Sequence, residues 1–211
     1  MSEQWVDMAR SAGRILVPKS RDAVSGVAAF TEATGIEVPG SLWDKEYMKA
    51  DGRSFRLVPG GDMPGQIEAG WGDVAICSTE LVAEAGLPGI ASLRIGSPVC
   101  RYSVLALNEV ADDWQAFLER TSRYPISPRW LPSSFPRYLG MIAAGRDLPL
   151  LPMSVPISGK GEATMRDSGV GAVADRVVSG GTVQKLGGRE VYVLADIYPE
   201  LVVRSQDADA Y

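Results

Sequence analysis

Two hydroxyl residues flank a pair of glycines near the C-terminal end of the chain, in the order Ser179, Gly180, Gly181 and Thr182. Glycine tolerates a left-handed backbone, and a turn built on it can aim several backbone N–H groups at one point. A helix predicted to begin at Val183 would add the positive end of its dipole. The segment therefore predicts a cradle for a phosphate group. An ordinary glycine-rich turn between a strand and a helix explains the same composition equally well.

An apolar run over residues 170–174 precedes this segment and predicts a buried parallel strand. Asp175 follows where such a strand would end, and its carboxylate could accept hydrogen bonds from sugar hydroxyls. The pattern matches neither GxxxxGK[ST] nor a clean GxGxxG. A P-loop and a Rossmann dinucleotide site are therefore not predicted.

Composition limits the functions open to the chain. Its 211 residues can bury a sizeable core, and the length alone allows one large domain or two small ones. The formal net charge is −5, and no basic stripe is interleaved with aromatic residues, so we expect no nucleic-acid partner. No apolar run approaches ~20 residues. The first residues lack the basic start and apolar middle of a signal peptide, so we expect a cytoplasmic protein without a membrane partner.

The sequence contains no histidine. A Ser-His-Asp or Cys-His catalytic group, a histidine-ligated zinc site and an imidazole base are all excluded. Any chemistry must rely on carboxylates, lysine, arginine, backbone dipoles or a bound metal. The two cysteines, Cys77 and Cys100, lack metal-binding spacing and lie in apolar runs, so we expect buried free thiols.

Predicted strands alternate with predicted helices over both halves of the chain, which indicates an α/β protein. The predicted strands are residues 14–17, 55–58, 73–77, 103–107, 150–157, 170–174, 190–195 and 201–204. Residues 1–13 predict a short helix or a frayed extension. The other predicted helices cover 22–35, 62–70, 80–84, a segment after 112–113, 138–144, a segment after Ser158 that includes Glu162, and the segment from 183. Residues 36–54 predict only a loose hairpin, with turns at 39–40 and 51–52. Trp43 in that segment could stack on a base, although an aromatic residue is more often part of the core.

Six short stretches, read in chain order, resemble the ATP phosphoribosyltransferases that begin histidine biosynthesis. They are Leu16 to Arg21, Phe55 to Pro64, Ile67 to Ile76, Cys100-Arg101 with Arg123 to Pro125, Ser158 to Glu162, and Asp175 to Val183. The last stretch is similar to the family's loop for phosphoribosyl pyrophosphate (PRPP). Six matches in the right order are far more specific than any one of them.

The resemblance implies a two-lobed, type II periplasmic-binding-protein-like α/β fold with a ligand cleft between the lobes. The first lobe is expected to hold residues 1–103, with a C-terminal strand near 200–211 able to return to it. The second lobe is expected to hold residues 104–199 and the PRPP loop.

The activity that the resemblance implies is transfer of phosphoribosyl from PRPP to N1 of the adenine of ATP, with release of pyrophosphate. Mg²⁺ is the expected cofactor, carried by PRPP, with Glu162 as a further candidate ligand. The expected catalytic residues are Glu162 and Asp175. The expected PRPP-binding residues are Arg101, Arg123, Asp175, Arg176, Ser179, Gly180, Gly181 and Thr182. The expected nucleotide-binding residues are Lys19, Arg21, Asp62 and Ser78.

The sequence departs from the family near the expected ligand loops. Pro59 and Gly61 stand where the family has arginines, Ser78 replaces a glycine and Gly171 replaces an aspartate. Ser41 to Asp44 replace an element that touches the nucleotide in relatives. The clustering suggests a site retuned for another role, such as the specialised route to the nucleosides pentostatin and coformycin. Ordinary histidine biosynthesis is the competing hypothesis.

Other functions and partners remain open on the sequence alone. A non-catalytic, two-lobed module that binds a nucleotide or an anion would have the same fold. An extracytoplasmic solute receptor would share the fold class but would need an export signal. The chain is like the short form of the family, for which we expect a homo-oligomer and, as a possible partner, a histidyl-tRNA-synthetase-like regulatory subunit.

Overall fold

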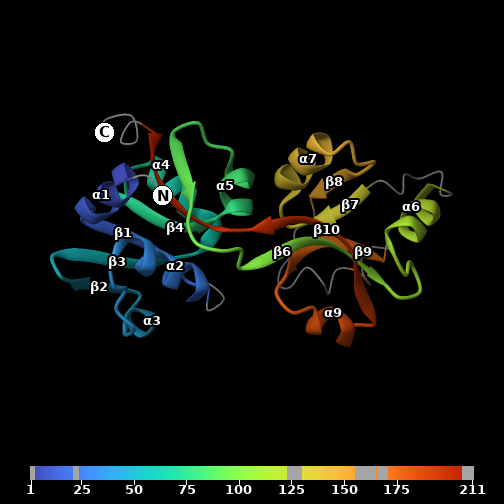
Figure 1. Cartoon of the computed structure of the whole chain (residues 1–211), viewed down its shortest axis with the longest axis horizontal. Coiled ribbons are helices and arrows are strands. Elements are labelled where there is room, and N and C mark those ends of the chain that lie inside the picture. Colours follow the sequence, from blue (N-terminus) through green and yellow to red (C-terminus); the bar gives the residue numbers. More distant parts are fainter. Residues whose placement is uncertain (1–2, 21–23, 123–129, 155–164, 166–170, 206–211) are drawn as a thin grey trace. The chain divides into compact units, whose positions relative to one another are not determined.

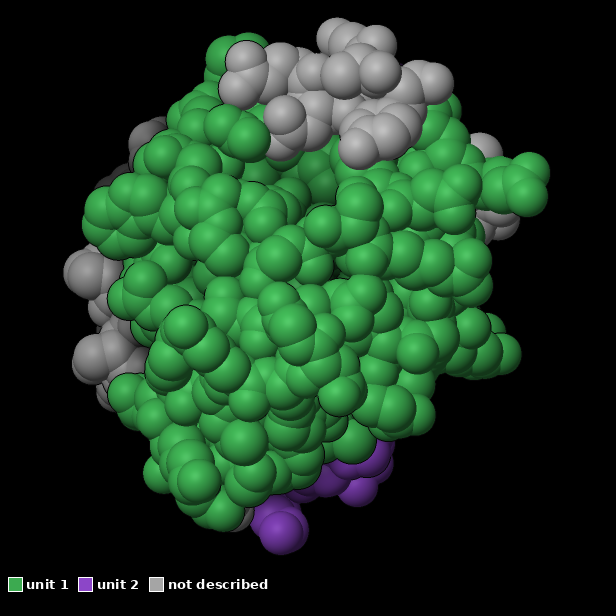
Figure 2. Space-filling model, turned by 90° about the vertical axis from the view of Figure 1, so that its left-hand side faces the viewer, with its two compact units in different colours: residues 1–99, 198–211 green, residues 100–197 purple. Residues whose placement is uncertain are grey.

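The computed structural model describes residues 3–20, 24–122, 130–154, 165 and 171–205 (Figure 1). The chain divides into two compact units, residues 1–99 with 198–211 (unit 1) and residues 100–197 (unit 2), which Figure 2 colours separately. The boundary expected from the sequence, after residue 103, lies inside the strand that opens unit 2. Among the described residues, none of the helices combines the length and the apolar character needed to span a membrane.

Unit 1 is built on a six-stranded mixed sheet with the order β2-β3-β1-β4-β11-β5. In that order the strands are Tyr47–Ala50, Arg53–Val58, Arg14–Pro18, Val74–Ser78, Pro199–Arg204 and Ile90–Arg94. β1 is parallel to β3 and β4, whereas β2 pairs antiparallel with β3, and β11 pairs antiparallel with both of its neighbours. β5 was not predicted, because it is short and carries a polar residue at its centre.

Helices pack on both faces of the unit 1 sheet. They are α1 (Glu3–Ser11), α2 (Val24–Thr34), α3 (Leu42–Lys45), α4 (Met63–Glu68) and α5 (Thr79–Ala85), with a 3-10 turn, η2 (Gly60–Asp62), before α4. Ile15 and Val17 of β1 share a core cluster with Phe30 of α2. Leu16 lies in a second cluster with Met63 of α4. β1 is therefore buried on both faces, which explains the continuous apolar run that predicted it.

Unit 2 is built on a five-stranded sheet with the order β10-β6-β9-β7-β8. In that order the strands are Gly188–Ile197, Cys100–Leu107, Ala172–Val177, Trp130–Ser133 and Leu151–Ser154, and the helices are α6 (Trp114–Ser122), α7 (Pro136–Gly145) and α9 (Gly181–Lys185). β9 is parallel to β7, as predicted, but antiparallel to β6. The sequence predicted a loop where β7 lies, because prolines crowd that stretch.

Several local predictions can be compared directly with the backbone. The turn at Asp51 and Gly52 is confirmed, with φ values of 51° and 75° in the two-residue loop between β2 and β3. Asp113 caps α6, since its Oδ1 accepts a hydrogen bond from the Ala116 backbone N–H at 2.8 Å. Asp62 occupies the N-cap position of α4 but forms no side-chain cap bond there.

The burial of Trp43 and of the two cysteines can be compared with the sequence predictions. Trp43 is half-buried and packs against the apolar core of unit 1, which favours the core interpretation of its ring. Both cysteines are free; Cys77 is buried and Cys100 is half-buried. Burial raises the pKa of the Cys77 thiol to about 12, so this thiol stays protonated and unreactive at neutral pH.

Candidate functional site

The predicted phosphate loop connects β9 to α9 in unit 2 (Figure 1). Gly180 has a φ of 75° and occupies the N-cap position of α9, a left-handed conformation that glycine adopts without strain. Gly181 directs its backbone N–H toward Ser179 Oγ at 3.5 Å. The buried side chain of Val183 lies in one apolar cluster with Val177 of β9. This packing fixes the start of the short helix, and with it the loop, on the sheet.

Asp175 lies within β9 rather than at its end, because the strand continues to Val177 opposite Arg101 of β6. Its cross-strand partner is Ser103 of β6. Directly opposed residues of an antiparallel pair present their side chains on the same face of the sheet. Asp175, Ser103 and Arg101 therefore share the face on which Val177 meets α9. The structure thus places the predicted ribose ligand, Asp175, on the sheet face that carries the phosphate loop.

Glu190 of β10 joins this face and was missed by the sequence analysis. Arg101 donates to it twice, from Nε to Oε1 at 2.9 Å and from one terminal nitrogen to Oε2 at 2.8 Å. The Ser103 hydroxyl donates a third hydrogen bond to Glu190 Oε1 at 2.6 Å. The bonds from Arg101 lower the pKa of Glu190 despite its partial burial, and the pair raises the pKa of Arg101. The predicted pyrophosphate ligand, Arg101, is thus already fixed by a carboxylate.

Arg176 lies on the opposite face from Asp175. It pairs with Tyr102 of β6, and its guanidinium carbon lies 5.7 Å from the centre of the Phe135 ring. This arrangement does not bring Arg176 together with Asp175 and Arg101, with which it was predicted to bind PRPP. Alternation along a strand explains the separation, since neighbouring residues point to opposite faces.

Three further predicted residues lie outside the described residues. They are Arg21, Arg123 and Glu162. Their roles remain predictions that the geometry does not address.

The other predicted nucleotide ligands lie at one edge of the unit 1 sheet. Lys19 follows β1, Asp62 lies in the turn after β3, and Ser78 ends β4. These three strands are adjacent and parallel, so their carboxyl ends meet at the same edge. The backbone N–H of Lys19 donates to the Val58 carbonyl at 2.9 Å and ties this edge together. Open α/β sheets bind ligands at the carboxyl ends of their strands.

Acidic partners engage two of these residues. The Lys19 ammonium forms an ion pair and hydrogen bond with Glu46, the residue between α3 and β2. The Ser78 hydroxyl donates to Oε1 of the fully buried Glu80 at 2.7 Å. Glu46 and Glu80 were not predicted as site residues. Glu46 is the C-cap residue of α3 and Glu80 lies in the first turn of α5, and neither belongs to a recognisable ligand motif.

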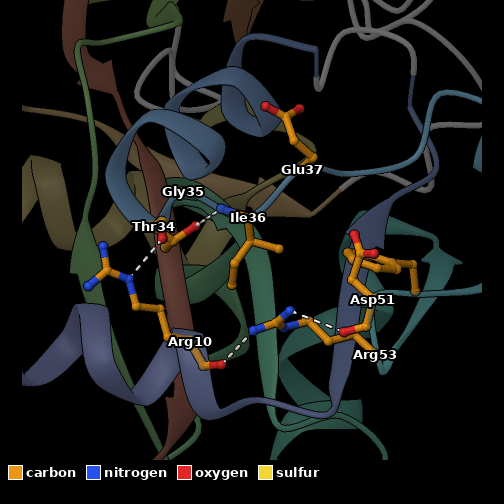
Figure 3. A pocket seen from close by; sticks show the side chains of 8 residues that line it. Arg10, Thr34, Gly35, Ile36, Glu37, Asp51 and Arg53 are labelled. Carbon is orange, nitrogen blue, oxygen red and sulfur yellow. Dashed lines mark hydrogen bonds between the residues drawn. The ribbon is translucent and has the colours of Figure 1, made fainter.

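A pocket of about 310 Å³ lies elsewhere in unit 1 (Figure 3). It is lined by Arg10, Thr34, Gly35, Ile36, Glu37, Asp51, Arg53 and Phe55, and it contains none of the predicted ligands. Figure 3 shows the Arg53 guanidinium bridging two backbone carbonyls, that of Arg10 at 2.7 Å and that of Asp51 at 3.4 Å. Arg53 thereby ties the end of α1 to the β2–β3 turn.

One departure from the family, Gly171, has a structural reason, whereas another, Gly61, has none. Gly171 has a φ of 68°, and a Cβ at this position would lie 2.4 Å from a methyl group of Val110. An aspartate would clash there, so glycine is required by the backbone. A Cβ at Gly60 would meet Leu81 at 2.8 Å, whereas a Cβ at Gly61 would meet no atom within 4 Å. The space around Gly61 would therefore accommodate a larger residue, and sterics do not explain the glycine.

The described residues offer carboxylates but no ready-made cage for a cation. No group of three or more acidic or cysteine side chains with metal-binding geometry occurs in the described parts of the chain. Glu190 accepts hydrogen bonds from Arg101 and Ser103, and Asp175 Oδ1 accepts one from the Arg176 backbone N–H at 2.8 Å. Mg²⁺ usually keeps substrate oxygens and waters as ligands, so an ion carried by a substrate would need few ligands from the protein.

Comparison with protein-family models and with curated proteins finds no match. Solved structures resemble the chain over nearly its whole length. The ATP phosphoribosyl transferase (HisG:HisZ) complex from Thermotoga maritima matches with a TM-score of 0.63 at 15% identity, covering 92% of this chain and 89% of that one. The periplasmic VFT2 domain of Bordetella pertussis BvgS matches with a TM-score of 0.55 at 9% identity, covering 98% and 86%. An L-arginine-bound amino acid transporter substrate-binding protein, AbpA of Streptococcus pneumoniae, matches with a TM-score of 0.51 at 10% identity, covering 97% and 87%.

These likenesses define the fold class. The chain has the α/β fold of type II periplasmic-binding-protein-like domains, as predicted. The same fold occurs in the phosphoribosyl transferase and in substrate-binding proteins, so it does not by itself decide between catalysis and binding.

Proposed function

We propose that the chain is a phosphoribosyltransferase of the ATP phosphoribosyltransferase type. The observation that carries this proposal is the combination on one face of the unit 2 sheet. The loop from Ser179 to Thr182 follows the strand that holds Asp175, and the Arg101–Glu190 pair lies on the same face. A phosphate cradle, a carboxylate for sugar hydroxyls and an oriented guanidinium are the groups that a phosphoribosyl donor requires.

In the proposed reaction, the lone pair of adenine N1 attacks C1 of the ribose. The new N1–C1 bond forms as the C1–O bond to pyrophosphate breaks, and pyrophosphate leaves with the bonding electrons. N1 is unprotonated at neutral pH, so the reaction needs no strong base, in keeping with a chain that lacks histidine. The loop would hold the 5-phosphate, Asp175 the ribose and Arg101 the pyrophosphate, with ATP as the acceptor that the resemblance implies. Positioning and charge screening would supply most of the catalysis.

A divalent cation on the donor would neutralise part of the pyrophosphate charge as it leaves. We propose Asp175, which shares the sheet face of the loop, as a described residue that would contact it, and Glu162 remains the candidate ligand from the sequence. The carboxylate of Asp175 would then serve both the ribose hydroxyls and the ion.

Pyrophosphate release tests this function. The protein is incubated with ATP, PRPP and Mg²⁺, with and without an added histidyl-tRNA-synthetase-like subunit, and the two reactions are compared. The complex named for the Thermotoga maritima structure motivates the added subunit. Release that depends on both substrates supports the proposal, whereas no release under either condition overturns it.

A non-catalytic binding module is the second candidate. It is favoured by the similarity to substrate-binding proteins and by Pro59 and Gly61, where the family has arginines. This module would bind PRPP or a nucleotide and release it without a chemical reaction. Calorimetric binding without pyrophosphate release would establish this alternative.

Two pathways would use the proposed reaction, histidine biosynthesis and a specialised nucleoside route. Complementation of a histidine auxotroph that lacks this first step separates them. Growth supports the primary pathway, and the absence of growth with an active purified protein supports the specialised one.

A further inference from the structure

The pocket of Figure 3 is a space that the fold of unit 1 leaves between four segments. The end of α1, the loop after α2, the β2–β3 turn and the first residues of β3 enclose its volume of about 310 Å³. Pockets that hold small organic molecules begin at roughly this size. All eight lining residues belong to unit 1, and none was predicted as a ligand of PRPP or of the nucleotide. The pocket is therefore a separate candidate site.

Hydrogen bonds fix the loop that forms one wall of the pocket. Gly35 has a φ of 73°, and its N–H donates to the Thr31 carbonyl at 2.8 Å. The Thr34 hydroxyl accepts from the Ile36 N–H at 3.2 Å, and the Thr31 hydroxyl donates to the Ile36 carbonyl at 3.0 Å. The buried side chains of Ile36 and Phe55 form the apolar part of the lining. The fold thus forms both the wall and the apolar surface of the pocket in advance.

The half-buried Arg53 lines this pocket with incomplete hydrogen bonding. A guanidinium has five N–H donors. The two terminal nitrogens of Arg53 donate to the Arg10 carbonyl at 2.7 Å and, at the longer distance of 3.4 Å, to the Asp51 carbonyl, whereas its buried Nε has no acceptor. Among the described residues, no carboxylate forms an ion pair with Arg53. A positive charge and several N–H donors are therefore left without a protein partner beside the pocket.

The other charged residues of the lining do not supply that partner. Arg10 is a second cation, whose Nε donates to a backbone carbonyl at 3.1 Å and whose terminal nitrogen lies 3.9 Å from the exposed Asp7 carboxylate. Glu37 and Asp51 are exposed acids, and Figure 3 shows the Glu37 carboxylate directed away from the Arg53 guanidinium. Two cations and two acids thus balance in number. Selection in this pocket depends on the unpaired donors of Arg53 and on the apolar surface, not on net charge.

We propose that this pocket binds a small organic carboxylate that has an apolar body. The carboxylate oxygens accept hydrogen bonds from the terminal N–H groups of Arg53 that the two carbonyls leave unused, a pairing that the planar guanidinium favours. The apolar body packs against Ile36 and Phe55. An inorganic anion has no apolar body, and a neutral molecule has no charge for Arg53, so the site selects a ligand that combines both. This inference does not depend on the proposed function.

NMR titration of the ¹⁵N-labelled wild-type protein tests the site, with benzoate, benzamide and inorganic phosphate as the probes. Benzoate and benzamide share a ring and differ in charge, whereas phosphate has charge without a ring. Benzoate is expected to bind saturably, at least about tenfold more tightly than either of the others, and to shift the Nε–H signal of Arg53 and the backbone N–H signal of Ile36. Equal affinity for benzoate and benzamide, equal affinity for benzoate and phosphate, or no shift of these two signals overturns the inference.

A pair of matched variants tests the anchor. Arg53→Lys keeps the positive charge and removes the planar fork, so benzoate is expected to bind about tenfold more weakly. Arg56→Lys is the control, because it makes the same change at an exposed position of β3 that does not line the pocket. Equal affinities of the two variants for benzoate overturn the assignment of Arg53. Circular dichroism verifies folding, and the wild-type titration decides the question if Arg53→Lys does not fold. Pyrophosphate release is measured separately, and its absence would overturn the proposed function and leave this inference standing.

Discussion

Arg101 and Glu190 are not cross-strand neighbours, yet their side chains form a two-point ion pair. The register places Asp196 opposite Arg101 and Leu105 opposite Glu190. Two register shifts in β10 separate Glu190 from Asp196. Arg101 therefore reaches along β6, past Ser103, to a carboxylate that also accepts the Ser103 hydroxyl. The pair holds the half-buried Arg101 guanidinium in one orientation.

Arg101→Ala should weaken PRPP binding. Loss of a charged hydrogen bond typically costs about 1.5–3 kcal/mol, which is a Kd increase of roughly tenfold or more. Titration calorimetry with PRPP and Mg²⁺ measures the change. Arg189→Ala is the control, because Arg189 lies on β10 but contacts Asn108 and Asp112 instead. Equal effects of the two substitutions would contradict the role of Arg101.

If the proposed site is right, Asp175→Ala and Thr182→Ala should each cost about 1.5–3 kcal/mol in kcat/KM, since each would remove a hydrogen bond to a charged or polarised substrate group. Steady-state pyrophosphate release gives both values. Val178→Ala serves as the comparison, because this neighbouring side chain is 69% exposed. Unchanged kinetics in both variants would remove the loop from the site.

The two glycines of the loop should respond differently to alanine. Gly180→Ala forces a side chain into a left-handed backbone and should destabilise the protein by about 1–2 kcal/mol. Gly181 begins α9 without a positive φ, and its added Cβ would meet no atom closer than 3.7 Å, so Gly181→Ala should be nearly neutral. Urea denaturation of both variants measures the contrast. A similar loss in each would mean that the backbone of Gly180 is not constrained as described.

The Glu190 carboxylate should make stability depend on acid pH. Arg101 lowers its pKa in the folded state below the usual value of 4.5, so the folded form binds fewer protons than the unfolded form near that pH. The stabilisation is present above pH 4.5 and is lost as pH falls through the lower folded pKa. For a partly exposed pair it should be no more than about 1 kcal/mol. The free energy of unfolding of Glu190→Gln should approach that of wild type as pH falls; a constant gap from pH 7 to pH 3 would contradict this linkage.

Gly61→Arg should restore a cation at the unit 1 edge. There is open space at its Cβ position, so the substitution should fold, and ATP should bind roughly tenfold more tightly than it binds to the wild-type protein. Gly60→Arg provides the contrast, since its Cβ would press on Leu81 and should lower the melting temperature. No gain for ATP in a folded Gly61→Arg protein would show that charge does not limit binding at this edge.

Continuous apolar runs were the most reliable guide to the fold. Residues 14–17 and 73–77 predicted β1 and β4 because both strands are buried on both faces. The glycine pair predicted the turn into α9, since a left-handed residue is needed there. β5 and β7 were not predicted, because their short sequences contain polar residues or proline and take strand form only through their neighbours.

The partners of the predicted ligands could not be found by the same means. Glu190 meets Arg101 only because of the register shifts in β10, and no local pattern encodes those shifts. Glu46 meets Lys19 because it ends α3 in a left-handed conformation, within a segment that predicted only a loose hairpin. Pairwise contacts across a fold depend on such details, whereas burial and turns leave a periodic trace in the sequence.

β11 gives the order in which the protein can assemble during synthesis. It lies between β4 and β5 in the interior of the unit 1 sheet, and Leu201, Val202 and Val203 are completely buried there. The ribosome makes this strand after all of unit 2, whose residues 100–197 are continuous in the chain. Unit 2 can therefore fold while unit 1 still has a gap in its sheet, and residues 1–99 must wait for their last strand. During that interval the nascent first unit exposes two unpaired strand edges, at β4 and β5, and unpaired edges of this kind favour aggregation.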